Sequence, residues 1–387
     1  MSDSFTEITN ESWLGRIGGA IKGVLVGLVL VVVAFGLLFW NEGRSVNRYK
    51  TLKEGSGAVI SVKSDTVDAK NEGKLVHMTG KADTTATLTD PVFGVSANAL
   101  KLDRIVEMYQ WKETSHTETK KKLGGGKKKV TTYTYDKIWS KNTIHSGRFK
   151  KQDGHQNPGS MPYKSLEQVA DNVTFGAFKL PLSLVSKINR FESLLVEPDM
   201  PLPESLKDTV KPNDGGYYIG ESPASPQVGD VRVRFRIVNP VEISIVSKQV
   251  GDTFEPYQTK AGGTIELLET GVFSADTMFK SAQNSNKIFT WIFRIVGFVL
   301  MLIGWSLIFS PLSVIADVVP FIGRIVAVGT GIIAFLISLI LSLLTIAIAW
   351  VFYRPVLGVS LLVVVIALIV LTRGKLKKSK KPVMQSS

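Results

Sequence analysis

Residues 288–372 form an almost wholly apolar stretch, which limits the possible folds more than any other feature of the sequence. Its charged side chains are Arg294, Asp317, Arg324 and Arg354. A helix of a soluble protein buries one apolar stripe and keeps a polar face, but this stretch has no polar face. A helix that is apolar all round needs about 20 residues to cross the hydrocarbon core of a bilayer. The stretch therefore predicts membrane-spanning helices.

Prolines divide this stretch, because proline interrupts helical hydrogen bonding, and the breaks are expected at Pro311, Pro320 and Pro355. The predicted spans are residues 288–309, 325–350 and 351–372. Another apolar segment, residues 23–40, lies near the N-terminus. It is longer than the apolar core of a signal peptide and no A-x-A-like cleavage site follows it, so it predicts an uncleaved anchor.

The polar remainder, residues 41–287, is long enough for one large domain or two small ones. The predicted fold class is an integral α-helical membrane protein with four spans and a large β-rich α+β extramembrane domain. The tail, residues 373–387, begins with six lysines and arginines in nine residues, which favours a cytoplasmic location. Four spans then place residues 1–22 and the link 310–324 in the cytoplasm, and residues 41–287 in the periplasm or an endomembrane lumen.

Alternating side chains predict several strands in the polar region. Residues 105–119 and 130–139 are rich in strand formers, and the glycines at 124–126 between them predict the tip of a long hairpin. Residues 230–238 give the clearest strand, with apolar side chains on one face and Arg232, Arg234 and Arg236 on the other. The three arginines could bind phosphate, but pairing with carboxylates across the sheet is the stronger interpretation. Residues 241–246 are predicted as a neighbouring strand.

Helices are predicted at three places in the same region. Residues 165–168 read Ser-Leu-Glu-Gln, a capping-box pattern. Leu184, Ile188, Phe191 and Leu195 fall at helical spacing and predict a helix that faces the core. Ser274 is expected to cap a helix that leads into the second span.

Lysines gather on both sides of the predicted hairpin tip. They are Lys120, Lys121, Lys122, Lys127, Lys128 and Lys129. One interpretation is a solvated, self-repelling loop that keeps the strand edges soluble. The other is a site that contacts an anionic lipid or polymer. Because predicted spans accompany the net charge of +13, we assign that charge to topology and to anionic lipids at the basic tail, and not to nucleic acid.

Small residues recur every four positions in two predicted spans and suggest close helix packing. They are Gly15, Gly19, Gly23 and Gly27 in the first set, and Gly323, Ala327 and Gly331 in the second. Glycine is also common in membrane helices without such a role. The packing interpretation predicts a homo-oligomer.

No motif for chemistry is present. The chain has no cysteine, and its four histidines have no metal-ligand spacing, so no catalytic, cofactor-binding or metal-binding residue is predicted. Charges at membrane depth mark a candidate polar site at Arg294, Asp317, Arg324 and Arg354, because such charges usually have a function or a partner. For Asp317, a place in an interfacial loop bent by the neighbouring prolines is the favoured interpretation.

The chain resembles the LUMA family (transmembrane protein 43-like). The resemblance rests on residues 40–44, 106–111, 131–135, 227–233, 311–317, 320–321 and 350–355. It implies one N-terminal span, a large lumenal domain, three C-terminal spans and no known catalytic residue. The resemblance further implies an oligomeric scaffold, which in animal members binds lamins and emerin. The lysine-rich insert and the missing cysteines are interpreted as signs of a bacterial member, to which those partners would not carry over.

Three functions follow as hypotheses. The first is a non-enzymatic, self-associating membrane scaffold that recruits or spaces envelope components from a bacterial inner membrane, or from an endomembrane if the chain is eukaryotic. The second is a transporter or channel component that uses the intramembrane arginines and Asp317. The third is an envelope enzyme whose carboxylates come from distant parts of the chain.

Overall fold

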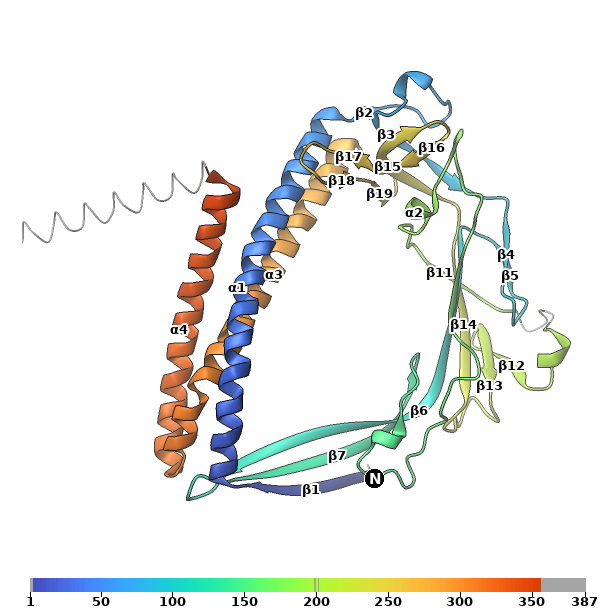
Figure 1. Cartoon of the computed structure of the whole chain (residues 1–387). Helices are drawn as coiled ribbons and strands as arrows, with labels where there is room; N and C mark the ends of the chain where they lie inside the picture. Colours follow the sequence, from blue (N-terminus) through green and yellow to red (C-terminus); the bar gives the residue numbers. More distant parts are fainter. Residues whose placement is uncertain (1–2, 198–199, 201, 356–387) are drawn as a thin grey trace, which may run out of the picture. The chain divides into compact units, whose positions relative to one another are not determined.

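The computed structural model describes residues 3–197, 200 and 202–355 (Figure 1). The chain forms two compact units. The described part of unit 1 consists of residues 3–9, 51–120 and 128–282, and that of unit 2 of residues 10–50, 121–127 and 283–355.

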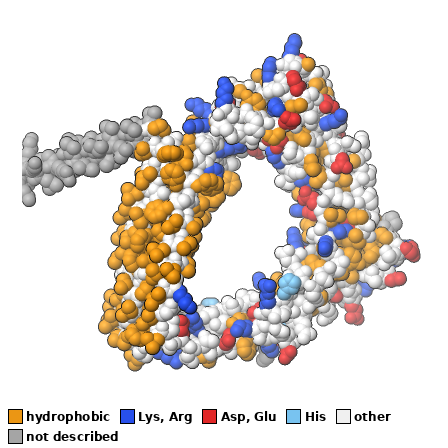
Figure 2. Space-filling model, in the orientation of Figure 1, with side chains coloured by type: hydrophobic (Ala, Val, Ile, Leu, Met, Phe, Trp, Pro, Cys, Tyr) orange, Lys and Arg blue, Asp and Glu red, His pale blue; other side chains and the backbone are white. Residues whose placement is uncertain are grey.

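Three long helices dominate unit 2. They are α1 (Trp13–Ala58), α3 (Ala275–Ala316) and α4 (Pro320–Tyr353), and each is long and apolar enough to cross a membrane. Residues 51–58 of α1 and 275–282 of α3 belong to unit 1. Hydrophobic side chains cover the visible faces of these helices (Figure 2). Large exposed apolar side chains on all three helices indicate that their solvent is lipid.

The described helices confirm an integral membrane protein with a β-rich region, but not the count of four spans. The predicted spans 23–40, 288–309 and 325–350 fall within α1, α3 and α4. Of the predicted span 351–372, residues 351–353 end α4, and residues 356–372 lie outside the described residues.

Pro311 was expected to end a span, but α3 continues through it to Ala316. Proline in a helix deprives the carbonyl four residues earlier of its N–H donor. Here that carbonyl belongs to Leu307, and the Ser310 hydroxyl donates to it at 2.8 Å. A serine side chain thus replaces the lost hydrogen bond, as is common in membrane helices. Pro320, by contrast, starts α4, where a missing N–H does no harm.

The closest approach of α1 and α3 uses a predicted packing glycine. A Cβ atom on Gly27 would lie 2.6 Å from the carbonyl oxygen of Gly304, so only glycine fits there. Around the same crossing, Ala34 and Leu38 of α1 pack on Met301 of α3 in a small buried cluster.

We expect Gly27→Ala to destabilise this crossing by about 1–3 kcal/mol, because the added methyl group has no room. Gly18→Ala is the matched control, since a Cβ there would meet no described atom within 4 Å. That control should gain up to about 1 kcal/mol from the better helix propensity of alanine. Thermal unfolding in detergent measures both changes, and an equal response of the two variants would contradict the assigned crossing.

Two larger sheets and two hairpins make up most of the β-structure. The eight-stranded sheet has the order β1 (Asp3–Glu11), β7 (Lys127–Ser140), β6 (Lys101–Lys121), β14 (Val231–Val238), β13 (Gly216–Ile219), β12 (Val210–Asn213), with β11 (Glu192–Leu194) on β14 and β8 (Leu166–Val169) on β6. The seven-stranded sheet has the order β10 (Phe178–Lys179), β9 (Thr174–Phe175), β3 (Leu75–Asp83), β15 (Val241–Val250), β16 (Thr253–Glu255), with β19 (Leu267–Thr270) on β15 and β2 (Ile60–Ser61) on β3. The two-stranded pairs are β17 (Tyr257–Gln258) with β18 (Thr264–Ile265), and β4 (Thr87–Thr89) with β5 (Ser96–Asn98). The short helices are α2 (Leu182–Val185), η1 (Ala69–Asn71), η2 (Ser146–Arg148) and η3 (Glu204–Leu206).

Each large sheet has its own apolar core. Val106, Val233 and Tyr217 lie in the core of the eight-stranded sheet, and Val76 and Ile245 in that of the seven-stranded sheet. The predicted hairpin is confirmed as β6 and β7, and residues 122–126 form its tip.

The arginines of β14 pair with carboxylates, as predicted. Arg232 and Arg236 face Glu107 and Asp103 directly across the β6–β14 ladder, at 2.6 Å and 2.5 Å. Arg234 reaches Asp214 at 2.7 Å. These pairs give the three arginines structural partners, and no phosphate is needed to explain them.

Two predictions about the neighbourhood of β14 are wrong. Residues 241–246 belong to β15, which lies in the other sheet, because β14 is already bonded to β6 on one edge and to β13 and β11 on the other. Residues 165–168 do not open a helix, since the Ser165 hydroxyl accepts the Val106 amide at 3.0 Å and β8 follows.

The helix expected from Leu184 to Leu195 is also absent from the described chain. Its first turn is α2, but β11 occupies residues 192–194, and Leu195 is 62% exposed. A short apolar run at helical spacing does not distinguish a helix from a strand. The Ser274 cap is confirmed, since its hydroxyl accepts the Thr277 amide at 3.3 Å.

The N-terminal strand β1 was not predicted, and several contacts hold its unit 1 part to the sheet. Glu7 accepts from the Tyr133 hydroxyl at 3.1 Å, and Asp3 contacts buried His155 at 3.0 Å. The His155 ring stacks on Tyr135 with centroids 3.9 Å apart. Burial, with the hydrogen bond to Glu113, raises the pKa of Tyr135 to about 12, so this phenol stays a donor at neutral pH.

Candidate functional site

A buried carboxylate joins the three long helices of unit 2. Glu42 of α1 is 1% exposed, and Arg294 of α3 binds it through Nε and Nη2 at 2.6 Å and 2.9 Å. The indole nitrogen of Trp350 in α4 donates to the same carboxylate at 2.8 Å. Bidentate arginine–carboxylate pairs are strong and directional, so this contact fixes the relative positions of the three helices.

A second set of polar side chains extends this pair toward the end of the helices. Asn41 donates to the Thr290 carbonyl at 3.0 Å, and Asn286 donates to the Ser45 carbonyl at 2.9 Å. Arg44 donates to the side chain of Asn286 at 3.2 Å. We call these residues, together with Glu42, Arg294 and Trp350, the Glu42 network. It satisfies most of its polar groups internally, as buried polar groups require.

Another carboxylate lies buried at the opposite end of the same helices. Asp317, in the turn between α3 and α4, is 1% exposed and pairs with Arg16 of α1 and Lys121 of the hairpin tip. Arg16 also donates to the Gly125 carbonyl. We call these four residues the Asp317 cluster.

Backbone contacts fix the hairpin tip beside this cluster. The Gly124 amide donates to the Val318 carbonyl at 3.1 Å, and the Trp13 indole donates to Val314 at 2.9 Å. Gly124 and Gly125 have φ angles of +81° and +79°, which only glycine adopts readily. Burial disfavours the charged form of Asp317, but the hydrogen bonds from Arg16 and Lys121 outweigh it and lower its pKa.

The two charged sites mark the two ends of the apolar bundle. Arg16 and Glu42 are 26 residues apart on one helix, which corresponds to roughly 39 Å. The hydrocarbon core is about 30 Å thick. Trp40, Trp291 and Trp350 lie at or near the Glu42 level, as in the aromatic belts of membrane proteins. Both sites therefore fit the interfaces of a bilayer and not its centre.

These contacts conflict with part of the predicted topology. Residues 1–22 and 310–324 were placed in the cytoplasm, and residues 41–287 on the other side. Arg16 and Asp317 of the first group contact Lys121 of the second, and β1 pairs with β7 in one sheet. Residues in such contact lie on one side of the membrane, but residues 59–120, which join α1 to the hairpin tip, form no membrane-spanning helix. The contacts at Asp317 and the predicted sides of the bilayer therefore exclude each other.

Single cysteines in this cysteine-free chain test that arrangement. We expect Ser4→Cys and Leu123→Cys to react with a membrane-impermeant maleimide from the same side of sealed vesicles. If Leu123→Cys and Ser4→Cys reacted from opposite sides, the predicted topology would hold and the hairpin contacts would be wrong.

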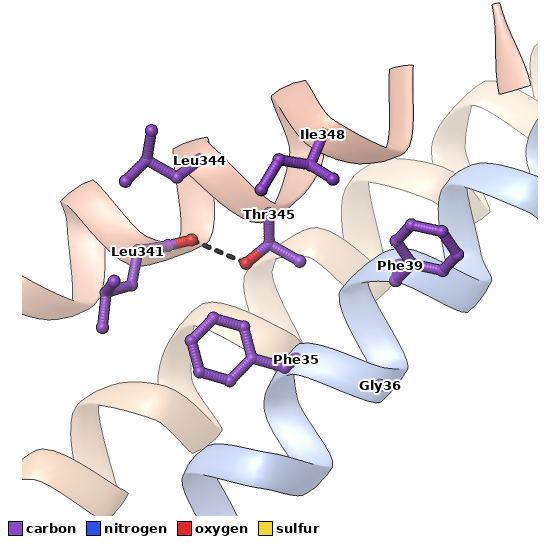
Figure 3. Close-up of a pocket in the computed structure, with 7 residues that line it drawn as sticks. All are labelled: Phe35, Gly36, Phe39, Leu341, Leu344, Thr345 and Ile348. Carbon is purple, nitrogen blue, oxygen red and sulfur yellow. Dashed lines mark hydrogen bonds between the residues drawn. The ribbon is translucent and has the colours of Figure 1, made fainter. Parts of the chain in front are cut away.

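Grooves between the helices are apolar. One groove, of about 490 Å³, lies between α1 and α4. The only side-chain oxygen among its lining residues, that of Thr345, donates to the Leu341 carbonyl at 2.7 Å (Figure 3). Another, of about 370 Å³, lies between α3 and α4, where Arg294 is already bound to Glu42. Such surfaces suit acyl chains better than a polar substrate.

Comparison with known proteins places the chain in a family. The family model for Transmembrane protein 43 matches residues 108–355. Transmembrane protein 43 of mouse is 36% identical over 363 residues, with 90% of each chain covered, and that of human is 35% identical, with 96% of this chain and 94% of the relative covered. The chain belongs to the Transmembrane protein 43 family. The Drosophila homolog is 29% identical, with 87% of this chain and 90% of the relative covered. No solved structure matches.

Membership in this family confirms the resemblance inferred from the sequence. The relatives named here are animal proteins, so they give no support to the interpretation of this chain as a bacterial member. As the family model matches residues 108–355, it covers the hairpin tip, Arg294 and Asp317.

The four predicted charged residues do not form one site in this family member. Arg294 is half-buried and pairs with Glu42, whereas Asp317 is buried and pairs with Arg16 and Lys121. Arg324, expected to share a helix face with Asp317 if the link were helical, is exposed. Arg354 follows α4, and its amide donates to the Trp350 carbonyl at 2.8 Å.

Some of the predicted packing residues contact other parts of the chain, and others do not. Gly23 and Gly27 face α3, and Gly323 faces Asp317, so these three serve contacts within the chain. Ala327 is half-buried. An added Cβ would meet no described atom within 4 Å at Gly19 or Gly331, and only Ser12 at Gly15.

The lysines of the hairpin have different surroundings. Lys121 is paired with Asp317, and Lys122 donates to Asn10 at 2.8 Å. Lys120 is exposed, and Lys127, Lys128 and Lys129 are half-buried. The interpretation as a purely solvated loop is therefore wrong for Lys121.

The sequence analysis did not identify Glu42 as the partner of Arg294. The signal was available, because Arg294 interrupts an apolar segment and a charge at that depth requires a partner. Glu42 directly follows the first apolar segment, but one sequence does not show that the two segments are neighbours.

Proposed function

We propose that this family member is a non-enzymatic membrane scaffold that self-associates and recruits or spaces other membrane components through its β-rich region. One observation carries the proposal. The buried charges of the bundle are used to join helices and to hold the hairpin tip, as Glu42–Arg294 and Asp317–Arg16 show. Such contacts stabilise a fixed arrangement of elements, which a scaffold needs.

The transporter alternative has less support. A transport path uses ionisable groups that face a cavity and change partners. This hypothesis used Arg294, Asp317 and Arg354, and the first two are each held by a buried partner. The enzyme alternative needs two converging carboxylates in a deep pocket. The two grooves described above are lined by apolar side chains, apart from Arg294, Ser342 and Thr345.

Partners and location are part of the proposal. We propose a homo-oligomer in contact with anionic lipids and with other membrane proteins, and no nucleic acid. The bacterial inner membrane is the location predicted from the lysine-rich insert and the missing cysteines. An endomembrane is the location for a eukaryotic chain.

Chemical crosslinking of the full chain in native membranes tests self-association. We expect dimers or larger species for the natural sequence, and fewer of them for Gly19→Leu and Gly331→Leu, whose positions are open in the described chain. Gly159→Ala, in an open loop of unit 1, is the control and should crosslink normally. Monomers alone for the natural sequence would remove the basis of the proposal.

A further inference from the structure

We propose that the groove between α3 and α4 binds one anionic phospholipid, whose phosphodiester contacts Arg294 and whose acyl chain lies along the groove. The groove has a volume of about 370 Å³, and its lining residues all belong to unit 2. The inference rests on the proposed function only for the contact with anionic lipids, because self-association plays no part in it.

The first argument is a hydrogen-bond donor that remains available in the groove. Arg294 lines the groove and uses its Nε and Nη2 atoms for Glu42. Its third nitrogen, Nη1, has no acceptor among the described residues and keeps some accessible surface. The guanidinium carbon also lies 4.9 Å from the ring centroid of Trp291 and 5.7 Å from that of Trp350. A guanidinium fixed in this way is a preorganised donor for a phosphate oxygen.

The second argument is an unbalanced positive charge beside that donor. The Glu42 network contains two guanidinium groups, those of Arg44 and Arg294, and one carboxylate, which leaves one positive charge in excess. The acceptors of Arg44 are uncharged side chains, among them Asn286 and Thr290. An anionic headgroup at Arg294 would balance this excess, whereas a zwitterionic headgroup would not.

The third argument is the length and lining of the groove. Trp350 and Leu339 line it 11 residues apart on α4, which corresponds to roughly 16 Å. One leaflet supplies half of a hydrocarbon core of about 30 Å, so the groove and one acyl chain have similar lengths. Beyond Arg294 its lining is apolar except for the Ser342 hydroxyl, which already donates to the Met301 sulfur at 3.5 Å. A further helix would cross the whole core, about twice this length, so a lipid of one leaflet matches the groove better.

These features together select the ligand. A phosphodiester supplies oxygen acceptors for Arg294, and the acyl chain attached to it covers the apolar part of the groove. A free phosphate ion supplies the acceptors but makes no use of the apolar walls. One excess cation near a membrane surface attracts an anionic lipid by a factor of roughly five.

Photolabelling of the full chain in nanodiscs tests the proposal. The discs contain equal parts of phosphatidylcholine and phosphatidylglycerol, with a trace of one or the other carrying a diazirine on an acyl chain. We expect phosphatidylglycerol to label residues 291–298 and 339–350 roughly five times as strongly as phosphatidylcholine, as measured by mass spectrometry of peptides. Equal labelling by the two lipids would overturn the proposal. An absence of label from both would also overturn it, because a second copy or residues 356–372 would then cover the groove.

A double variant separates the donor from the surrounding charge. Glu42→Gln with Arg294→Gln removes the guanidinium but leaves the net charge of the Glu42 network unchanged, because one charge of each sign is lost. We expect the preference for phosphatidylglycerol to fall to its level at lipid-facing residues outside the groove. If the preference stayed fivefold, general attraction by the remaining charge would explain it, and the contact with Arg294 would be wrong.

Groove-filling variants test the acyl chain without touching the buried ion pair. Leu339→Trp with Leu343→Trp fills the groove from side chains that are 38% and 58% exposed, and it should lower the labelling of residues 291–298 several-fold. Ile340→Trp, at a position that is 56% exposed and outside the groove, is the matched control and should keep the labelling. Equal labelling of the filled and control variants would contradict an acyl chain in the groove.

Inorganic phosphate distinguishes the source of the anion. Added to the mixed discs, it should leave the preference for phosphatidylglycerol unchanged. If phosphate abolished the preference at an ionic strength where chloride did not, the site would bind free anions and the lipid proposal would fail. Crosslinking of the natural sequence measures self-association separately, so a failure of the lipid proposal and a failure of the scaffold proposal give different results.

Discussion

Glu42→Ala is expected to lower the free energy of unfolding by about 3–5 kcal/mol, the usual effect of removing one partner of a buried ion pair. The variant leaves the Arg294 guanidinium and the Trp350 indole without their carboxylate acceptor. Both groups lie where the three helices meet, so neither finds water easily. Unfolding by denaturing detergent in mixed micelles measures the change.

A double variant separates the charge effect from a packing effect. Glu42→Met with Arg294→Met removes both charges and keeps the side-chain volume, and such replacements are often neutral or stabilising. We therefore expect the double variant to be more stable than Glu42→Ala. Glu204→Ala, which breaks an exposed pair with Lys207, is the control and should cost less than about 1 kcal/mol. If Glu42→Ala behaved like this control, the Glu42 network would not hold the helices together.

Local patterns in the sequence predicted the local elements well. The alternation of residues 230–238 gave β14, and the arginines on its polar face pair with carboxylates as expected. The apolar segments predicted the three membrane helices, because a helix that is apolar on every face is stable in lipid and not in water. In each case the deciding information lies within a few neighbouring residues.

What the sequence did not predict depends on distant partners. Ser165 begins a capping-box pattern, but its hydroxyl accepts a hydrogen bond from the Val106 amide of β6, and a strand follows. β1 is a short polar segment whose strand character comes from its pairing with β7. Asp317 and Lys121 are 196 residues apart, and no spacing rule links them. Hydropathy likewise identifies spans but not the contacts between the segments that they separate.

Asp317→Ala is expected to release the hairpin tip without unfolding the β-sheets. The variant leaves Arg16 and Lys121 buried or half-buried beside each other without their shared carboxylate. A loss of about 3–5 kcal/mol raises the population of the open tip by a factor of roughly a hundred to several thousand. Hydrogen exchange of the Gly124 amide, which is bonded to Val318, reports this opening directly. Asp252→Ala breaks an exposed pair with Lys179, and this control should leave the exchange unchanged.

The acidity of Asp317 gives the same experiment a pH signature. Its pKa is lowered below the ordinary value of 3.8, because the hydrogen bonds from Arg16 and Lys121 outweigh the effect of burial. A depressed folded pKa contributes stability that is fully present above the ordinary value and is lost as the pH falls through the folded pKa. Protection of Gly124, corrected for intrinsic exchange, should therefore stay constant from neutral pH down to about 5 and decline only below about 4. A decline between pH 7 and 5 would mean that another group, and not this carboxylate, holds the tip.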